Sequence, residues 1–596
     1  MKFLSKILKW IKGFTDAITR FPLTFIFLIF AAITNALAIE SSNDYSKIIL
    51  TLAVGAFLFI VAQIIYERFL NTALYRYSLM LAALLLTGGY YLSLLLASNI
   101  SFETGLKTFV ALFALLIAFI YVPSIKEKTD FNSVFMAVFK SFFISAFFSL
   151  IIWGGVSLIL LAINNLLFTI KNTANIHAAN IIFVIFAPMY LLSLVPIFTD
   201  KEEDKEDIEK ASSCPKFLEI LISYILMPIT AVYTLVLVSY IIKTIVTVKA
   251  FWTDNMLEPL ILTFSAAVIL LYILSGNLTN RFARFFKMIF PKVLVFIVLF
   301  QLVSTIINIF TGGFVIGRYY VFLFGIYSVI TGILFSILPV KKNGIAAALV
   351  IAFALISIIP PVDAFTVSKT SQISILENTL KKDGMLKDNT VTPNASIPDK
   401  DKNTIRNSIQ NINEMGYIKQ IKWLPNNFEM NDYATDIVIS DFKNLFGFSY
   451  DENAPNNNNL KNVGIYLTLD PCGLLNINGY DFMFTKSFNI PNTSEDNLVS
   501  FIKAGKNYSL LQTITNDDCI YKVVSSNSKE IISFSLKPAF DEFLNLNSDK
   551  KLLTPEEATF TNENGSAKIS VVFKTININS LNNTINAEVL ILISIK

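Results

Sequence analysis

Histidine is almost absent from this chain of 596 residues, whose one histidine is His177. A metal site with two histidines is therefore impossible within one chain, and a Ser-His-Asp triad would depend on this single imidazole. The sequence also lacks the Gly-x-x-x-x-Gly-Lys-Ser/Thr loop of Walker-type ATP binding and the Gly-x-Ser-x-Gly elbow of many hydrolases. We expect no cofactor and no metal, and a surface position for His177, with a lone general base as the alternative.

Charged residues are also scarce, at 15% of the chain against 54% hydrophobic residues, and the mean hydropathy is +0.59. Soluble proteins have about a quarter of their residues charged, so this composition indicates a membrane protein. The net charge of +4 gives no support for a nucleic-acid partner, which requires a clustered basic face. Aspartate and glutamate are absent from the middle of every long apolar stretch, which argues against a carrier coupled to ions through an intramembrane carboxylate.

Eleven long apolar stretches fill the first 360 residues, and the remaining 236 residues have the composition of a soluble domain. A helix needs roughly 20 apolar residues to cross a hydrocarbon core about 30 Å thick. The sequence therefore predicts a polytopic α-helical membrane bundle of about 11 transmembrane helices over residues 21–360, followed by a soluble α+β domain over 361–596. The predicted spans are Phe21–Ile39, Ile48–Tyr66, Tyr77–Ala97, Leu106–Val122, Val134–Ile163, Ala178–Phe198, Phe217–Val248, Pro259–Ser275, Val293–Phe310, Tyr319–Leu338 and Gly344–Pro360.

Lysine and arginine are distributed unevenly between the two sets of loops. Segments on the N-terminal side of the membrane carry 19 basic residues, and the opposite loops carry five. Cytoplasmic loops are the ones enriched in lysine and arginine, so we expect a cytoplasmic N-terminus. An odd number of crossings then places residues 361–596 outside the cytoplasm, and one crossing more or fewer would reverse that side.

The first 20 residues have the pattern of a basic amphipathic helix. Lys2, Lys6, Lys9 and Lys12 recur at three-to-four spacing with apolar residues between them. Such a helix lies on the anionic inner leaflet, so residues 1–20 are expected to form a cytoplasmic interfacial helix. A signal peptide is the rival interpretation, although no clear small-x-small cleavage site follows the first apolar run.

Two prolines interrupt neighbouring spans. Pro188 lies in the sixth stretch and Pro228 in the seventh, and proline kinks a helix because it lacks a backbone N–H. Paired interrupted helices are typical of transporter binding sites, while the alternative is that each proline only shapes packing. Tyr233 and Tyr240 follow Pro228 on one helical face and predict a packing seam beside it.

A polar stripe runs along the ninth stretch. Gln301, Ser304, Thr305 and Asn308 recur at spacings that place them on one face of a helix. They either line a polar cavity, as part of a substrate path with the prolines, or hydrogen-bond to neighbouring helices and hold the bundle together.

The soluble part reads first as helices and then as strands. Helical spacing predicts helices over Thr366–Leu386 and Ile405–Ile418, and alternating apolar residues then predict strands. A bridge between Cys472 and Cys519 is one alternative for the two cysteines of this part, and free thiols are the other. The predicted strands are Val463–Thr468, Cys519–Val524, Ile531–Leu536, Ile569–Thr575 and Ala587–Ile595.

Several short motifs resemble those of a bacterial membrane family. They are Tyr224-Ile-Leu-Met-Pro228 with Tyr233, Leu237, Tyr240 and Lys243; Arg318-Tyr319; Ser368-Lys369-Thr370-Ser371-Gln372; Trp423-Leu424-Pro425; Phe446-Gly447-Phe448; and Gly479-Tyr480-Asp481.

Over roughly residues 130–500 the chain is similar to the family catalogued as domain of unknown function 4153. It departs from the family pattern after Trp252, where Thr253-Asp254 stand in place of the expected proline and glycine. The resemblance implies a bacterial envelope location and the two-part layout. It implies no reaction and no catalytic residue.

Three classes of function follow from these observations. The first is a non-enzymatic sensor, scaffold or assembly factor whose outer domain binds a ligand, an envelope protein or a wall polymer. The second is a transporter or lipid-handling permease, because eleven spans exceed what an anchor needs. A membrane-embedded hydrolase or transferase has the least support, since the usual residues are absent. The expected surroundings are the lipid bilayer, and the oligomeric state stays open.

Overall fold

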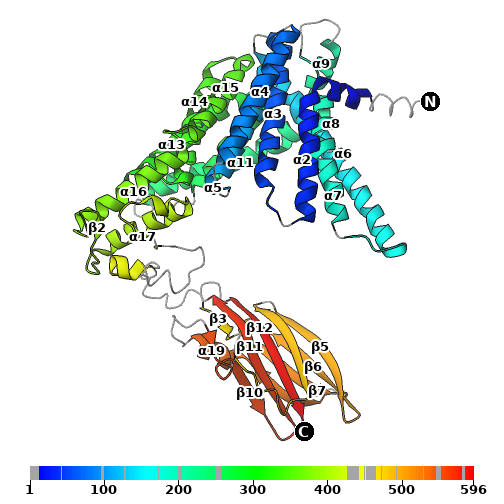
Figure 1. Ribbon diagram of the computed structural model, residues 1–596, viewed down its shortest axis with the longest axis vertical. Helices are drawn as coiled ribbons and strands as arrows, with labels where there is room; N and C mark the ends of the chain where they lie inside the picture. Colours follow the sequence, from blue (N-terminus) through cyan, green and yellow to red (C-terminus); the bar gives the residue numbers. More distant parts are fainter. Residues whose placement is uncertain are drawn as a thin grey trace. The chain divides into compact units, whose positions relative to one another are not determined.

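The computed structural model resolves two compact units, Met1–Glu452 and Asn453–Lys596, which are described separately (Figure 1). The sequence predicted one soluble domain over 361–596, whereas the contacts divide this region after Glu452. The structure describes the chain except for residues 1–11, 42, 71, 96–99, 126–128, 172, 199–204, 248–256, 426–427, 429–441, 449, 451–464, 471–472, 492, 528, 545–551 and 580–583.

The first unit is a helical bundle followed by a smaller helical region. Ten helices, counted within the described residues, are long and apolar enough to cross a membrane, and the shorter apolar helix α12 occupies the eighth predicted stretch. The predicted fold class is therefore confirmed. The elements of the bundle are α2 (Pro22–Glu40), α3 (Ser46–Phe69), α4 (Ala73–Leu95), α5 (Phe102–Tyr121), η1 (Val122–Ser124), α6 (Phe131–Leu166), α7 (Ala174–Asn180), η2 (Ile181–Phe186), α8 (Ala187–Leu194), α9 (Lys205–Ser212), α10 (Lys216–Ile220), η4 (Leu221–Leu226), α11 (Met227–Thr247), α12 (Leu257–Leu274), α13 (Arg281–Gly312), α14 (Ile316–Ile337), η6 (Val340–Lys342) and α15 (Gly344–Ile358).

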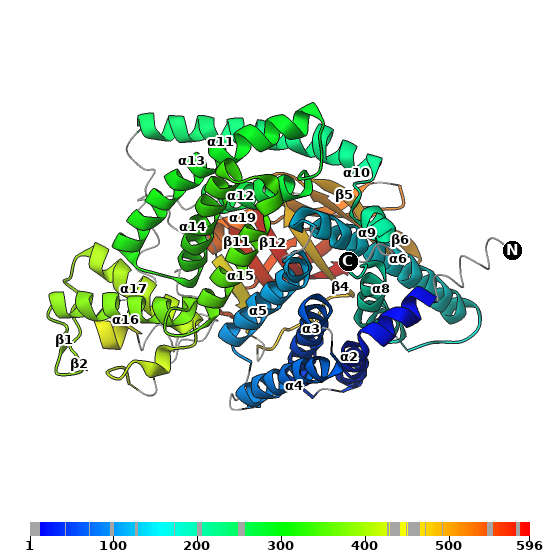
Figure 2. The same cartoon turned by 90° about the horizontal axis from the view of Figure 1, so that it is seen from above.

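Helices that follow one another in the sequence form much of the bundle. Helix α3 packs between α2 and α4, α13 packs along α14, and α5 lies beside α15 (Figure 2). Helix α12 is antiparallel to α13, because Glu258 at its start lies 3.4 Å from the Thr305 hydroxyl. At its other end the Lys287 ammonium donates to the carbonyl oxygens of Ser275 and Leu278, at 3.2 and 2.9 Å. A cation at these carbonyls stabilises the helix C-terminus.

Segments that the sequence assigned to the same side contact one another. On the side of the N-terminus, Arg20 forms an ion pair with Glu67 at 2.8 Å and donates to the Val195 carbonyl at 2.7 Å. At the opposite ends of the helices, His177 lies 2.9 Å from Glu40, with the ring 30% exposed. His177 therefore lies in α7, with a partly exposed ring that hydrogen-bonds to Glu40.

The N-terminal helix is described only in part. Lys2, Lys6 and Lys9 lie outside the described residues, while residues 12–20 are helical. Phe14 stacks on Phe186 at 6.0 Å between ring centres, and Ala17 is buried against the bundle. This end of the segment packs on protein, and its location at a membrane surface stays a prediction.

A π-helical turn stands directly before each of the two prolines. The turn η2 ends with a hydrogen bond from the Ala187 N–H to the Ile182 carbonyl, and η4 ends with one from Met227 to Ile222. Pro188 and Pro228 come next and have no N–H for the regular i−4 bond, so the wider turn accommodates the missing donor. Each proline thus follows a change of helical pitch, and a kink at Pro188 or Pro228 stays a prediction.

A second helical region, the juxtamembrane region (residues 363–450), follows the bundle within the same unit. It contains α16 (Ala364–Lys382), β1 (Leu386–Lys387), β2 (Thr390–Val391), α17 (Asp399–Glu414), η7 (Ile418–Gln420) and a short helix at 442–446. The two predicted helices are confirmed, with starts two and six residues earlier than expected. The core of the region includes the fully buried Leu376, Ile405, Ile409 and Phe446.

The family-like aromatic motifs have structural roles in this region. The Trp423 indole N–H donates to Glu377 of α16 at 3.2 Å, and Phe446 packs on Phe442 with 4.7 Å between ring centres. Gly447 has a φ of +83°, and a Cβ there would lie 2.9 Å from the Asn394 backbone nitrogen. Only glycine fits this close approach of two backbones.

The second unit consists of two sheets that share one core; the smaller is antiparallel, and the larger is antiparallel except for the parallel pairing of β3 with β9. Buried residues of both sheets, such as Val523 and Val571, belong to one hydrophobic cluster. The larger sheet has the order β4-β12-β11-β3-β9, with β10 paired to β11, and the smaller has the order β5-β6-β7-β8 (Figure 1). The elements are β3 (Ile465–Leu469), β4 (Phe482–Ile490), β5 (Ser494–Lys503), β6 (Lys506–Ile514), β7 (Cys519–Ser525), β8 (Glu530–Ser535), α19 (Lys537–Leu544), β9 (Leu552–Leu553), β10 (Thr559–Glu563), β11 (Ala567–Asn579) and β12 (Thr584–Ile595).

All five predicted strands are confirmed, as β3, β7, β8, β11 and β12. Cys519 is fully buried in β7, and burial raises the pKa of its thiol to about 11. Cys472 lies outside the described residues, as do Thr253 and Asp254. Cys519 is a free thiol in the structure, which favours the second of the two alternatives for this cysteine.

Candidate functional site

The predicted polar stripe of α13 faces the inside of the bundle. Gln301, Thr305 and Asn308 are 2%, 0% and 8% exposed. Within the described residues, the Gln301 side-chain nitrogen has no hydrogen-bond partner, and the same holds for the hydroxyls of Ser328 and Thr331 on α14. Buried polar atoms are usually paired, so this seam holds more hydrogen-bonding capacity than helix packing uses.

The same face of α14 lies close against α13. A Cβ at Gly325 would come within 2.7 Å of Leu302, and one at Gly332 within 2.7 Å of Val295. Ser328 lies between these glycines on one helical face, because the spacings are three and four residues. The polar groups of α14 therefore face the helix that carries the stripe.

One end of the stripe reaches two charged side chains. Glu258, in the first turn of α12, accepts a hydrogen bond from Thr305 at 3.4 Å, and Arg318 of α14 interacts electrostatically with its carboxylate. The sequence did not mark Glu258 as a site residue, because its position at the end of a span resembles an ordinary interfacial carboxylate. Tertiary packing brings it to the stripe.

The turn between α13 and α14 is held by α16. The Gln372 side-chain nitrogen donates to the carbonyl oxygens of Gly312 and Phe314, at 3.0 and 2.9 Å, and the Ser371 hydroxyl accepts from the Phe314 N–H at 2.9 Å. Gly313 has a φ of +70°, and a Cβ there would lie 2.3 Å from Ile375 of α16. The turn therefore needs glycine, and Gln372 satisfies carbonyl groups that end α13.

A polar cavity of about 350 Å³ lies beside this turn, and we name it the Arg318–Gln372 cavity. Arg318 supplies its one charged lining group, and the other polar groups are hydroxyls and amides. A guanidinium beside amides and hydroxyls suits a small ligand that has an anionic group and further hydrogen-bonding groups. Its lining residues are Thr311, Gly312, Val315, Arg318, Gln372, Ile375, Thr404, Asn407, Ser408, Gln410 and Asn411.

The cavity joins two of the family-like motifs. Arg318-Tyr319 opens α14, and Ser368-Lys369-Thr370-Ser371-Gln372 lies in α16, yet both reach the same turn. The side chain of Gln372 also accepts a hydrogen bond from Asn411 of α17 at 3.3 Å. The two motifs are separate segments in the sequence, and in the structure both contribute to the Arg318–Gln372 cavity.

A buried ion pair forms a second connection between the bundle and the juxtamembrane region. Lys107 of α5 lies 3.0 Å from Asp363, which is fully buried, and 2.7 Å from Glu103. Glu103 also accepts a hydrogen bond from Tyr417. Burial raises the pKa of Asp363, but hydrogen bonds from Thr366 at the start of α16 and the charge of Lys107 outweigh it. The pKa of Asp363 therefore lies below its ordinary value.

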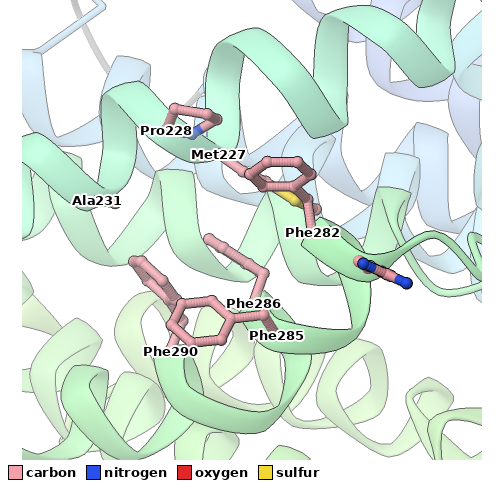
Figure 3. Close-up of a pocket in the computed structure, with 8 residues that line it drawn as sticks. Met227, Pro228, Ala231, Phe282, Phe285, Phe286 and Phe290 are labelled. Carbon is pink, nitrogen blue, oxygen red and sulfur yellow. The ribbon is translucent and has the colours of Figure 1, made fainter.

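A separate apolar groove of about 720 Å³ lies between α11 and α13 (Figure 3). Pro228 and Met227 form one wall, and the rings of four phenylalanines of α13 form the other. Arg281 is the one charged lining residue, and Phe282 and Phe285 are about half exposed on the same helix. The groove is lined by Met227, Pro228, Ala231, Arg281, Phe282, Phe285, Phe286 and Phe290.

The seven predicted site residues thus fall into separate places. Gln301, Thr305 and Asn308 form the buried stripe in the last third of α13, and Pro228 lines the apolar groove beside its first third. These positions stay predictions as a substrate path.

The other three predicted residues lie on α8 and α11. Pro188 follows Ala187, whose carbonyl accepts from Ser145 of α6 at 2.7 Å. The Tyr233 hydroxyl donates to the Leu260 carbonyl of α12 at 3.1 Å, and the Tyr240 side chain is 38% exposed. Tyr233 therefore joins α11 to α12.

Comparison with known proteins gives one family. No curated protein and no solved structure matches the chain. The family model described as Domain of unknown function (DUF4153) matches residues 23–386, which is more than half of the chain. The match includes Pro228, Arg318 and Gln372 and ends before Trp423, Phe446 and Gly479. With the membrane-type helices and the α13–α14 turn inside the match, the chain belongs to the DUF4153 family of domains of unknown function.

Proposed function

We propose that this protein is a non-enzymatic receptor of the bacterial cell envelope that binds a small anionic ligand in the Arg318–Gln372 cavity. In this proposal the N-terminus is cytoplasmic, residues 361–596 lie outside the cytoplasm, and the juxtamembrane region passes the bound state to α13 and α14. An envelope protein or a wall polymer bound by the outer part is the expected partner.

The observation that carries this proposal is the composition of the cavity walls. Thr311 and Arg318 come from the membrane bundle, whereas Asn407 and Asn411 come from the juxtamembrane region. A ligand that contacts both walls favours the state in which they are close together, because it binds that state more tightly. Gln372 couples the same two parts by direct hydrogen bonds to the turn.

The proposed sides of the membrane have two supports. The first is the excess of lysine and arginine on the N-terminal side. The second is helix α12, whose Glu258 end lies at Thr305 and whose Ser275 end lies at Lys287. We propose that α12, a shorter apolar helix whose two ends lie at Lys287 and Thr305 of α13, is the eleventh crossing, which makes the number of crossings odd.

Ligand binding is testable with the full chain in detergent and simple anions. We expect that phosphate, sulfate, acetate or glutamate, compared at equal ionic strength, raises the melting temperature of the wild type. Arg318→Gln removes this increase, and Asn407→Ala weakens it without removing a charge. Arg284→Gln, which removes an exposed arginine of α13, keeps the increase. Absence of any increase, or its survival in Arg318→Gln, would count against the proposal.

The proposed sides need their own measurement. A reporter enzyme that is active only outside the cytoplasm is fused after Lys596 or placed at the N-terminus. We expect activity only in the C-terminal fusion. An inactive C-terminal fusion with normal membrane insertion would reverse the proposed side and remove the receptor role.

A lipid-handling function is the second candidate, and the apolar groove at Pro228 favours it (Figure 3). Its phenylalanine walls suit an acyl chain, and Arg281 suits a lipid phosphate. Ala231→Trp fills the groove and is expected to lower the amount of co-purified phospholipid, whereas Val232→Trp, on the exposed neighbouring position, does not. Equal lipid in both variants would exclude this role for the groove.

A further inference from the structure

The larger sheet of the second unit carries a polar basin on its outer face. The basin has a volume of about 580 Å³ and spans four strands. Its outward-facing polar residues are Tyr466 of β3, Ser487 and Asn489 of β4, Thr575 and Asn577 of β11, and Asn586 and Glu588 of β12.

Strand register aligns these residues in a row. Asn577 is directly opposite Tyr466 on one side and Asn586 on the other, and Asn586 is opposite Asn489. The row therefore crosses β3, β11, β12 and β4 without a break. Neighbouring strands are about 4.8 Å apart, so the row presents one side chain at each such interval.

A second row lies two residues along the same face. Thr575 is opposite Thr468 and Glu588, and Glu588 is opposite Ser487. Because alternate residues of a strand share a face, both rows point away from the core. The basin is therefore a two-row array of hydroxyl and amide groups with one carboxylate, that of Glu588.

The three asparagines are not explained by folding. Asparagine is depleted in β-strands, and three of them occupy directly opposed outward positions on adjacent strands. The inward neighbours Ile576, Ile578 and Ala587 are buried and already supply the apolar face. A solvated outer face would be equally served by threonine or lysine.

The charge of the basin is balanced. Glu588 forms an ion pair with Lys574, and the rest of the lining is uncharged. Polyanions such as nucleic acids require clustered basic side chains, which this face does not supply. A neutral ligand matches the electrostatics.

We propose that this basin binds a neutral polysaccharide chain that lies across β3, β11, β12 and β4. Each carboxamide both donates and accepts hydrogen bonds, as neighbouring sugar hydroxyls do. A pyranose ring is about as wide as the strand spacing, so successive sugars meet successive asparagines. Tyr466, which is 58% exposed, places an aromatic ring at the end of the row for the apolar face of a sugar.

This inference deepens the proposed function. A wall polymer can be the natural ligand of the basin only if the second unit lies outside the cytoplasm, as proposed above. The two proposals fail separately. A cytosolic reporter after Lys596 would overturn the receptor role, whereas saccharide binding by the purified chain does not depend on the side of the membrane.

The test is calorimetric titration of the full chain in detergent with β-1,4-linked N-acetylglucosamine tetramer and with cellotetraose. We expect one of them to bind. Tyr466→Ala and Asn577→Ala each weaken it about tenfold, because a lost ligand hydrogen bond or ring contact is worth about 1 to 1.5 kcal/mol. Asn577→Thr, which suits a strand better, weakens binding equally and guards against misfolding.

The matched control is Asn507→Ala, which removes an exposed asparagine of β6 outside the basin and leaves binding unchanged. Two results would overturn the inference. One is the absence of binding by both neutral tetramers, including the case in which only a polyanion such as heparin binds. The other is binding that Asn577→Ala and Asn577→Thr leave intact.

Discussion

The two compact units differ in how completely their buried polar side chains are hydrogen-bonded. Within the described residues, every buried side-chain nitrogen or oxygen without a hydrogen-bond partner belongs to Met1–Glu452. In the second unit, the buried Gln512 donates to the Tyr521 hydroxyl at 3.0 Å, and Ser570 lies 2.6 Å from the Tyr480 hydroxyl. An unpaired buried group lowers the free energy of unfolding by about 1 to 3 kcal/mol. Within the described residues, this destabilisation therefore applies to the first unit and not to the β unit.

The difference corresponds to the two binding places that we propose. The bundle keeps polar groups inside, along the stripe that ends at Glu258 and the Arg318–Gln372 cavity. The β unit satisfies its interior and displays its spare hydrogen-bonding groups on an outer sheet face. Substitutions in each unit test this difference between the bundle and the β unit.

The largest effect is expected where the bundle holds a buried charge. Lys107→Met leaves Asp363 buried beside no cation and is expected to destabilise the first unit by about 3 to 5 kcal/mol. Thermal unfolding of the full chain, followed by helical circular dichroism, measures this effect. Lys381→Met, which breaks a partly exposed pair with Glu377, is the control and should cost about 0.5 kcal/mol or less. Equal losses of stability in Lys107→Met and Lys381→Met would show that the burial of Asp363 does not increase the cost of removing its cation.

The next effect concerns a satisfied polar group in the β unit. Gln512→Leu leaves the buried Tyr521 hydroxyl without this donor, and a cost of about 1 to 3 kcal/mol is expected. Loss of β-sheet signal in denaturant measures it. A neutral Gln512→Leu would contradict the account of a fully paired interior.

A smaller effect should appear on acidification. The folded-state pKa of Asp363 lies below its ordinary value of 3.8, so its contribution to stability is present above that value. The contribution is lost as the pH falls below 3.8 through the folded-state pKa. The melting temperature of the wild type should therefore fall more steeply below pH 4 than that of Asp363→Asn, which cannot titrate. Parallel curves would show that the ion pair does not stabilise the fold.

The smallest effect is expected at the stripe. Gln301→Leu removes a buried nitrogen that has no partner within the described residues, so stability should stay within about 1 kcal/mol or rise. The contrast with Gln512→Leu is the direct comparison of the two units, because both substitutions exchange a buried glutamine for leucine. Destabilisation of both by similar amounts would remove the distinction.

Much of the fold was predictable because the physics is local. A membrane crossing needs a long apolar run, so each of the eleven stretches contains a helix, and the alternating strand β12 was recognised in the same way. Strands β4, β5 and β6 were missed because polar residues interrupt their alternation, as in Ser494–Lys503, and their pairing is set by neighbours distant in sequence.

The candidate site was predicted only in part. The spacing of Gln301, Thr305 and Asn308 correctly indicated one helical face, because helical periodicity is a property of a single segment. Glu258, Lys107 and Asp363 acquire their roles from partners up to 256 residues away in the chain, as 363 − 107 shows for the ion pair. No pattern within one segment records such a contact.

The most direct test of the central claim is a distance between α14 and α17. Spin labels at Gly317→Cys and Lys400→Cys, in a chain with Cys214 and Cys472 replaced by serine, report whether the juxtamembrane region is fixed to the α13–α14 turn. Both labelled positions are exposed. The account predicts one narrow distance distribution, which broadens in Gln372→Ala because the hydrogen bonds to Gly312 and Phe314 are lost. A distribution that is already broad, or one that Gln372→Ala leaves unchanged, would contradict it.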